Sequence, residues 1–169
     1  MPTAPEPLAA DHALEKFDCS VATLDKWLQR SAMASQANGR ARTYVICDAG
    51  QVLGYYALAL KAVVTVAPAR AHGSLLAPAP VVMLARLAID RSHQKRGLGR
   101  SLFRDAARRV IQAAEETGIR ALLVRFLSEE AREFYLRVGL EASLLDPMTL
   151  MMTVADLRLA QRSEGADCG

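Results

Sequence analysis

Few folds accommodate the order found in the middle of this sequence: an apolar run, then a short basic turn with two glycines, then a helical pattern. Residues 81–89 are almost entirely apolar, which is typical of a central strand covered on both faces. The turn spans Gln94–Arg100, and apolar residues recur at helical spacing from Leu98 to Ala113. The sequence therefore predicts a strand, a tight turn and a helix in direct succession.

The residue types in this turn suit a bound pyrophosphate. The start of a helix carries unpaired backbone N–H groups and the positive end of the helix dipole. Gly97 and Gly99 lack a Cβ, so a bulky anion can approach that backbone, and the basic residues Lys95, Arg96 and Arg100 add charge. The alternative is an ordinary basic surface turn. The turn lacks the lysine–serine ending of the nucleotide triphosphatase loop, and it lacks the glycine spacing of dinucleotide folds. It therefore matches neither of these two motifs.

The rest of the chain predicts one mixed α/β domain over residues 1–169. A hairpin is expected from strands at 43–47 and 51–61, where Gly54 indicates a bulge or a close backbone neighbour. A right-handed parallel β-α-β crossover is expected over 81–126, within a mixed sheet that has helices on both faces. The other expected elements are a helix over 23–37 with a Thr23 cap and buried Leu24, Trp27, Leu28 and Met33, a connecting segment at 65–80, a helix from 97 to 117, a strand at 121–126, a helix capped by Ser128 that ends at Gly139, a strand at 149–154, and a helical turn at 155–162 before a frayed tail.

Composition sets the class of protein. The 169 residues are 51% hydrophobic and carry a formal net charge of +3, as in an ordinary globular protein. Arginine outnumbers lysine by 17 to 4, which suits phosphate recognition but equally fits a compositional bias of the genome. The three cysteines are scattered, and His12, His72 and His93 have no metal-ligand spacing, so no metal is expected. Without a signal-peptide pattern or a long apolar stretch, the sequence favours a cytoplasmic protein that contacts no membrane.

Two stretches resemble the signatures of the GNAT N-acetyltransferases. Gln94-x-x-Gly97-x-Gly99, after Leu87-Ala88-Ile89-Asp90, resembles the coenzyme A signature, and Ser128-x-x-Ala131-x-x-Phe134-Tyr135 resembles the late motif, whose helix lies beside the pantetheine arm. The resemblance implies a GNAT fold with a central, mixed but mostly antiparallel sheet, acetyl-CoA as co-substrate and N-acetyltransferase activity. The cofactor-binding residues that it implies are Leu87, Ala88, Ile89, Gln94, Lys95, Arg96, Gly97, Leu98, Gly99, Arg100, Ser128, Ala131 and Phe134.

Tyr135 matches the family position near the thioester sulfur, which implies a catalytic role. When an amine attacks a thioester a thiolate leaves, and a phenol can protonate it. The alternative is a half-buried residue of an amphipathic helix. Backbone N–H groups near Leu87 to Ile89 are the expected donors to the thioester carbonyl. Direct transfer depends on proximity and orientation, so no Ser/His/Asp or Cys/His arrangement is required.

Almost the whole chain is similar to the acetyltransferase toxins of bacterial toxin–antitoxin pairs. This resemblance implies acetylation of the free amine of an aminoacyl-tRNA, which blocks translation. It also implies a ribbon-helix-helix antitoxin that inhibits the toxin and joins it in repressing their operon, so that operator DNA is contacted only through that complex. A homodimer is expected as the commonest soluble assembly. The stretches that carry the likeness are Phe17–Cys19, Leu24–Leu28, Arg42–Val45, Gly54–Leu58, Leu84–Asp90, Glu130–Gly139 and Asp146–Met151.

Two other functions stay open at this point. One is acetylation of small amines in detoxification or metabolism, and the other is a non-catalytic module that binds coenzyme A or a protein. Arg86 lies in a buried type of strand, so it needs either a substrate phosphate or a structural carboxylate, such as Asp90 or Glu133. Four further cations are either a patch for tRNA phosphates or an ordinary solvated face. These are Lys26, Arg30, Arg40 and Arg42.

Overall fold

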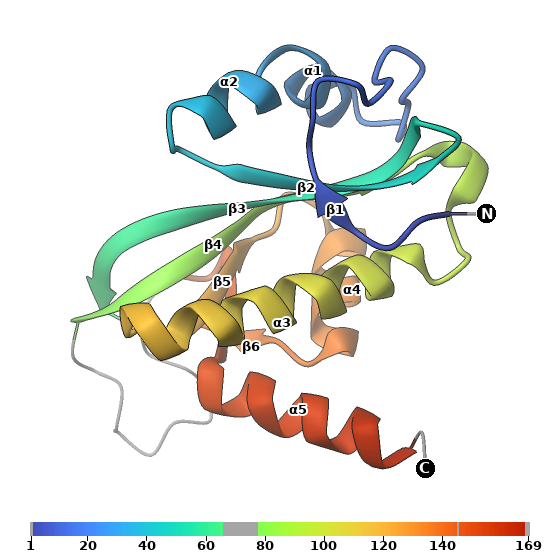
Figure 1. Ribbon diagram of the computed structural model, residues 1–169. Helices are drawn as coiled ribbons and strands as arrows, with labels where there is room; N and C mark the ends of the chain where they lie inside the picture. The colour runs from blue at the N-terminus through green and yellow to red at the C-terminus, as the bar shows by residue number, and fades with distance from the viewer. Residues whose placement is uncertain (1, 66–77, 145, 168–169) are drawn as a thin grey trace. The chain divides into compact units, whose positions relative to one another are not determined.

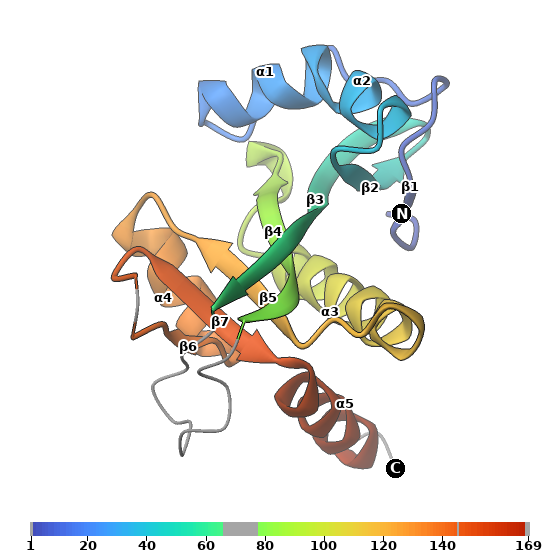
Figure 2. The same cartoon turned by 90° about the vertical axis from the view of Figure 1, so that its left-hand side faces the viewer.

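The computed structural model describes residues 2–65, 78–144 and 146–167. Within them, seven strands form a sheet of order β1-β2-β3-β4-β5-β7-β6 (Figures 1 and 2). The β4–β5 pair is parallel, whereas β1–β2, β2–β3, β5–β7 and β6–β7 are antiparallel, which confirms the predicted mixed sheet. The elements are β1 (Glu6–Pro7), α1 (Ala22–Arg30), α2 (Ala32–Ala37), β2 (Arg42–Asp48), β3 (Gln51–Thr65), β4 (Pro78–Ile89), the 3₁₀ helix η1 (Arg91–His93), α3 (Leu98–Thr117), β5 (Ala121–Arg125), α4 (Glu129–Val138), β6 (Glu141–Ala142), β7 (Thr149–Thr153) and α5 (Val154–Asp167).

The chain divides into two compact units, and the first comprises residues 1–60 with 84–106. Tyr55 of β3 belongs to a buried cluster with Leu28 of α1 and Ala32 of α2. The next residue, Tyr56, points to the opposite face, where its hydroxyl donates to the carboxylate of Asp105 on α3. Helices therefore cover both faces of this part of the sheet, with α1 and α2 on one side of β2 and β3 (Figure 1).

Gly54 has the two features that the sequence predicts for it. The register of β2 and β3 shifts between Ile46 and Cys47, opposite Gly54, which is a β-bulge. A Cβ on Gly54 would lie 2.8 Å from Cδ1 of Ile89 and 3.4 Å from the carbonyl oxygen of Ala88. The bulge and the close backbone neighbour are both confirmed, and the neighbour is the end of β4.

The second unit comprises residues 61–83 and 107–169. In it, Val81–Met83 pair with Ala121–Leu123 in parallel, and β7 runs antiparallel along the full length of β5. Helices α3 and α4 both stop at a glycine in the left-handed region, with φ of +76° at Gly118 and +116° at Gly139. These two helix ends are confirmed where the sequence predicts them.

The first helical region differs from its prediction. The helix expected over 23–37 is two helices, because Ser31 leaves the helical range with φ −121° and ψ −24°. Val21 occupies the N-cap position without a side-chain hydrogen bond, so the predicted Thr23 cap is wrong. One residue of the predicted buried side is exposed. Met33 is 40% exposed, and its predicted burial is therefore wrong.

The C-terminal region is more regular than predicted. Helix α5 continues to Asp167, where the sequence predicted a short turn and a frayed tail. At its start the N–H of Asp156 donates to Oγ1 of Thr153 at 3.1 Å, which satisfies one of the free N–H groups of a first turn. The predicted connecting segment at 65–80 lies mostly outside the described residues, and β4 already begins at Pro78. No helix in the described part of the chain is both long and apolar enough to cross a membrane.

Candidate cofactor-binding and catalytic site

The last residues of β4 lead directly into the predicted phosphate turn. The parallel ladder with β5 includes Met83 as its last pair, and β4 continues for six residues to Ile89. The N–H of Asp90 then donates to the carbonyl oxygen of Leu53 at 2.8 Å, which ties the strand end to β3. The Asp90 carboxylate caps η1 by accepting the N–H of Ser92 at 3.0 Å. These bonds fix where the turn begins.

The turn itself holds two residues in the left-handed region. The φ angle is +63° at Lys95 and +80° at Gly97. A Cβ on Gly97 would meet nothing within 4 Å, so the backbone conformation alone calls for glycine there. Gly99 lies in the first turn of α3 and has no positive φ. A turn of this kind before a helix N-terminus can gather N–H groups around an anion, and the side chains of Lys95, Arg96 and Arg100 are exposed around it.

Gln94, the first residue of the turn motif, uses its side chain within the protein. Its amide nitrogen donates to the carbonyl oxygen of Ile89 at 2.9 Å and to that of Cys19 at 3.1 Å. An amide has two N–H donors, so both are engaged. Within the predicted cofactor-binding set, Gln94 therefore holds the turn in place, whereas its neighbours can face a ligand.

The late motif lies on one helix, α4, in the second unit. The hydroxyl of Ser128 accepts the N–H of Ala131 at 3.1 Å and so caps the helix. The sequence therefore predicted this N-terminus correctly. Ala131 and Phe134 are half-buried on the same helix as Tyr135. The rings of Phe134 and Tyr135 meet edge to face, with centroids 5.2 Å apart.

Tyr135 is more deeply buried than the half-buried helix residue of the alternative interpretation. Its side chain is 7% exposed. Burial raises the pKa of its phenol above the usual value of about 10. A phenol is protonated at neutral pH even at its usual pKa, and this shift does not change that state. This state suits a general acid and does not suit a general base.

Arg86 has a partner that the sequence did not suggest. Its Cζ atom lies 4.2 Å from the centroid of the Trp27 ring, and Trp27 stacks on Tyr55 at 6.0 Å and 13°. A cation over an indole face is a favourable contact, worth about 0.5–1 kcal/mol at an exposed site. The carboxylate of Asp90, one of the expected partners, accepts the N–H of Asp18 and serves η1.

The four other cations proposed for tRNA lie in the first unit and are all exposed. Lys26 and Arg30 are four residues apart on α1, so they share one face of that helix. Arg42 is the first residue of β2, and Arg40 lies two residues before it. We refer to Lys26, Arg30, Arg40 and Arg42 as the basic group.

One cluster has the residue types of a metal site. Ligand atoms of Glu6, His12 and Cys47 lie within 4.8 Å of one another. However, Nδ1 of His12 accepts the N–H of Ala9 at 2.9 Å, which leaves the ring proton on Nε2. That proton is directed to the carboxylate of Glu6, 2.8 Å away. A metal needs the lone pair of that nitrogen, so the observed bonds are those of a histidine–carboxylate pair.

A known domain family and a curated relative match the sequence. The family model described as acetyltransferase (GNAT) domain matches residues 39–141. The tRNA-acetylating toxin of Mycobacterium tuberculosis (strain ATCC 25618 / H37Rv) is 41% identical over 157 residues. The alignment covers 92% of this chain and 95% of the relative. The similarity thus extends well beyond the domain match.

Solved structures of related proteins have the same fold. AtaT complexed with acetyl-methionyl-tRNAfMet has a TM-score of 0.86 at 30% identity, covering 94% of this chain and 98% of that one. A tyrosine-to-phenylalanine mutant of the AtaT toxin, bound to the C-terminus of the antitoxin AtaR and acetyl-CoA, gives 0.81 at 30% identity, with 94% and 96% covered. The AtaT–AtaR complex bound to DNA gives 0.77 at 31% identity, with 93% and 98% covered. With the domain match across more than half of its length, this chain belongs to the GNAT acetyltransferase family.

Proposed function

We propose that this protein acetylates the free amine of aminoacyl-tRNA with acetyl-CoA, and that it thereby blocks translation as the toxin of a toxin–antitoxin pair. The observation that carries the proposal is the 41% identity to a tRNA-acetylating toxin over 92% of this chain. The GNAT domain match begins only at residue 39, after α1 and α2. The longer match to the toxin includes the region that a general acetyltransferase assignment leaves out.

The turn Gln94–Arg100 is proposed to bind the pyrophosphate of the coenzyme. The left-handed Gly97, the start of α3 and the three exposed cations of the turn support this role. The bound coenzyme supplies the acetyl group as a thioester. Ser128, Ala131 and Phe134 are proposed to contact the pantetheine arm. The Ser128 oxygen accepts one backbone N–H, so its hydroxyl proton and its second lone pair remain for a ligand.

Tyr135 is proposed as the general acid of the transfer. The amine nitrogen attacks the carbonyl carbon of the thioester, a C–N bond forms as the C–S bond breaks, and the sulfur leaves as a thiolate. The phenol of Tyr135, which is protonated at neutral pH, gives that thiolate a proton, and the proton that the nitrogen loses on becoming an amide restores the phenol. Backbone N–H groups of Leu87 to Ile89 are proposed to donate to the carbonyl oxygen as negative charge develops on it.

The proposed partners follow from the same similarity. The basic group and Arg86 are proposed to contact tRNA phosphates. A ribbon-helix-helix antitoxin is proposed to neutralise the enzyme, and operator DNA is proposed to be bound only through that complex. We propose a cytoplasmic homodimer whose whole chain, residues 1–169, is one GNAT domain.

The experiment that tests the function offers the acceptor classes side by side. The protein is incubated with radiolabelled acetyl-CoA and, in separate reactions, charged tRNA, uncharged tRNA and a panel of small amines. We expect label on charged tRNA alone, and mild alkaline hydrolysis of the aminoacyl ester should release it from the RNA. Label on small amines without label on tRNA would support the metabolic alternative. A folded protein that binds acetyl-CoA but transfers nothing would support the non-catalytic one.

A further inference from the structure

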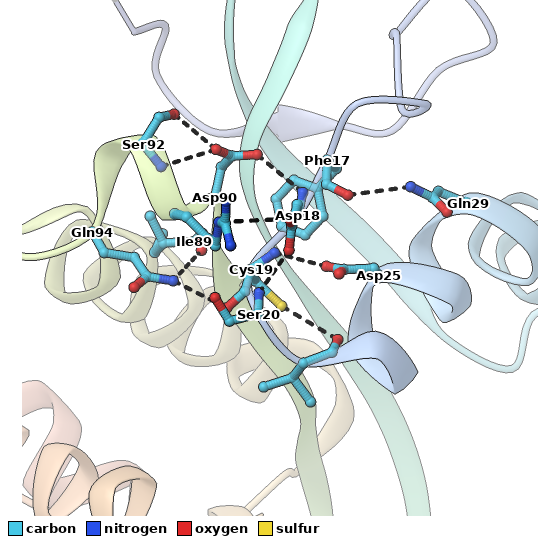
Figure 3. A network of polar contacts seen from close by, with 12 residues as sticks. Phe17, Asp18, Cys19, Ser20, Asp25, Gln29, Ile89, Asp90, Ser92 and Gln94 are labelled. Atoms are coloured by element: carbon cyan, nitrogen blue, oxygen red, sulfur yellow. Dashed lines mark hydrogen bonds and ion pairs between the residues drawn. The ribbon is translucent and has the colours of Figure 1, made fainter.

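A short N-terminal segment, Phe17–Ser20, is bound to the end of β4 and to η1 (Figure 3). The N–H of Asp18 donates to Oδ2 of Asp90 at 3.0 Å, and its carbonyl oxygen accepts the N–H of Arg91 at 2.8 Å. The side chains of Arg91 and Asp18 also form an ion pair at 3.5 Å. The amide of Gln94 adds its bond to the carbonyl oxygen of Cys19 at 3.1 Å. The segment thus lies directly against the residues that precede the cofactor turn.

Gln94 is the only one of these side chains that lies in the turn itself. Its two donors reach two carbonyl oxygens, one at the end of β4 and one in the Phe17–Ser20 segment. A side chain with donors is required there, because a carboxylate of the same shape would face two carbonyl oxygens with negative charge. The glutamine of the motif therefore joins three parts of the chain: strand end, turn and segment.

Asp90 supports the same junction from the other side. One of its oxygens accepts the N–H and the hydroxyl of Ser92, at 3.0 and 2.7 Å, and the other accepts the N–H of Asp18. Burial alone would raise the pKa of this carboxyl, but the hydrogen bonds from Ser92 and Asp18 outweigh it and lower the pKa. The carboxylate is therefore ionised at neutral pH and remains a full acceptor.

The segment in turn holds α1. The N–H of Cys19 donates to Oδ1 of Asp25, in the first turn of α1, at 2.9 Å. The amide of Gln29, on the same helix, donates to the carbonyl oxygen of Phe17 at 3.2 Å. Helix α1 carries Trp27, over whose ring Arg86 lies, and it carries two members of the basic group. A continuous series of hydrogen bonds therefore links the cofactor turn to the helix that carries the residues proposed for tRNA.

We propose that Gln94 is a positioning residue that couples acetyl-CoA binding at the turn to the placement of α1. The inference rests on the proposed function, because it requires the turn to be the acetyl-CoA site. When the turn is fixed by acetyl-CoA, Gln94 fixes the carbonyl oxygen of Cys19, and the segment fixes the first turn of α1. By linkage, ordering α1 strengthens acetyl-CoA binding by the same factor. The enzyme is thus prepared for its acceptor once the acetyl donor is bound.

The test measures hydrogen exchange of the α1 amides with and without saturating acetyl-CoA. In the wild-type protein, acetyl-CoA should slow exchange over Ala22–Arg30 by about fivefold or more, the lower end of typical coupling. In Gln94→Glu this protection should be lost, and the Kd for acetyl-CoA should rise by about tenfold. Gln112→Glu makes the same charge change at an exposed position of α3, and it should keep the wild-type protection.

A second variant keeps the test decisive if Gln94→Glu does not fold. Gln94→Met has a similar length, carries no donors and adds no charge, so it should also lose the protection of α1. Equal protection in wild type and in a folded Gln94 variant at saturating acetyl-CoA would overturn the coupling and leave the proposed function intact. Calorimetric titration with acetyl-CoA distinguishes a failure of the coupling from a failure of the proposed function. If wild-type protein does not bind acetyl-CoA at all, the proposed function fails, and the coupling fails with it.

Discussion

Gly97→Ala is the substitution whose effect can be worked out most directly from the backbone. Gly97 has φ +80°, and a Cβ added there meets nothing within 4 Å, so the change adds no steric contact. The remaining effect is the free-energy cost of placing a residue with a Cβ in the left-handed region, about 1–2 kcal/mol. If acetyl-CoA needs this conformation, the population of the competent turn falls, and the Kd should rise by a factor of about 5–30.

Gly118→Ala is the matched control, since Gly118 has φ +76° and the same open surroundings at the end of α3. It should lose a similar amount of stability, about 2–4 °C of melting temperature per kcal/mol in a protein of this size, and keep wild-type affinity. Calorimetric titration with acetyl-CoA and thermal unfolding measure the two quantities. Unchanged affinity in Gly97→Ala, or an equal loss in both variants, would refute the assignment of the turn as the pyrophosphate site.

Tyr135→Phe keeps the ring and loses the proton, so it should bind acetyl-CoA normally and turn over about 10²–10⁴-fold more slowly; wild-type kcat in the folded variant would exclude the general-acid role. Affinity for tRNA should fall steeply as the salt concentration rises, and neutralising the basic group should flatten that dependence. If the substitutions leave the salt dependence unchanged, a small-amine substrate is favoured. Burial raises the pKa of Cys19 to about 12 and of Cys47 to about 11, above an unfolded value near 8.5. The stability that these neutral buried thiols contribute is present below about pH 8.5 and is lost as the pH rises toward the two raised pKa values. The urea midpoint of unfolding should therefore fall between pH 8.5 and about 10.5. An unchanged midpoint over this range would contradict the shifts.

The parts of the fold that the sequence predicted are those set by local chemistry. The Ser128 cap and the glycine stops at Gly118 and Gly139 depend on residues within one turn of the helix ends. The hairpin and the bulge at Gly54 follow from strand composition and from one missing Cβ. The strand–turn–helix around Gly97 was predictable for the same reason, since its parts are consecutive in the chain.

The parts that the sequence could not predict depend on contacts between distant segments. Trp27 was expected to pack in the core, and no spacing rule could place Arg86 over its ring, because the two lie on different elements. Gln94 was predicted as a cofactor residue from its motif, but its bond to Cys19 depends on how the N-terminal segment folds back. The break at Ser31 likewise has no breaker residue, and it is visible only in the backbone angles.

Acetyl transfer to the amine of an aminoacyl-tRNA is the activity proposed for this protein. The most direct measurement is the mass of the aminoacyl-adenosine released by ribonuclease from charged tRNA after incubation with the protein and acetyl-CoA. We expect a gain of one acetyl group on the amino acid, and no gain on methionyl-tRNA whose amine is already formylated. An unchanged mass on every charged tRNA, with a folded protein that binds acetyl-CoA, would contradict it.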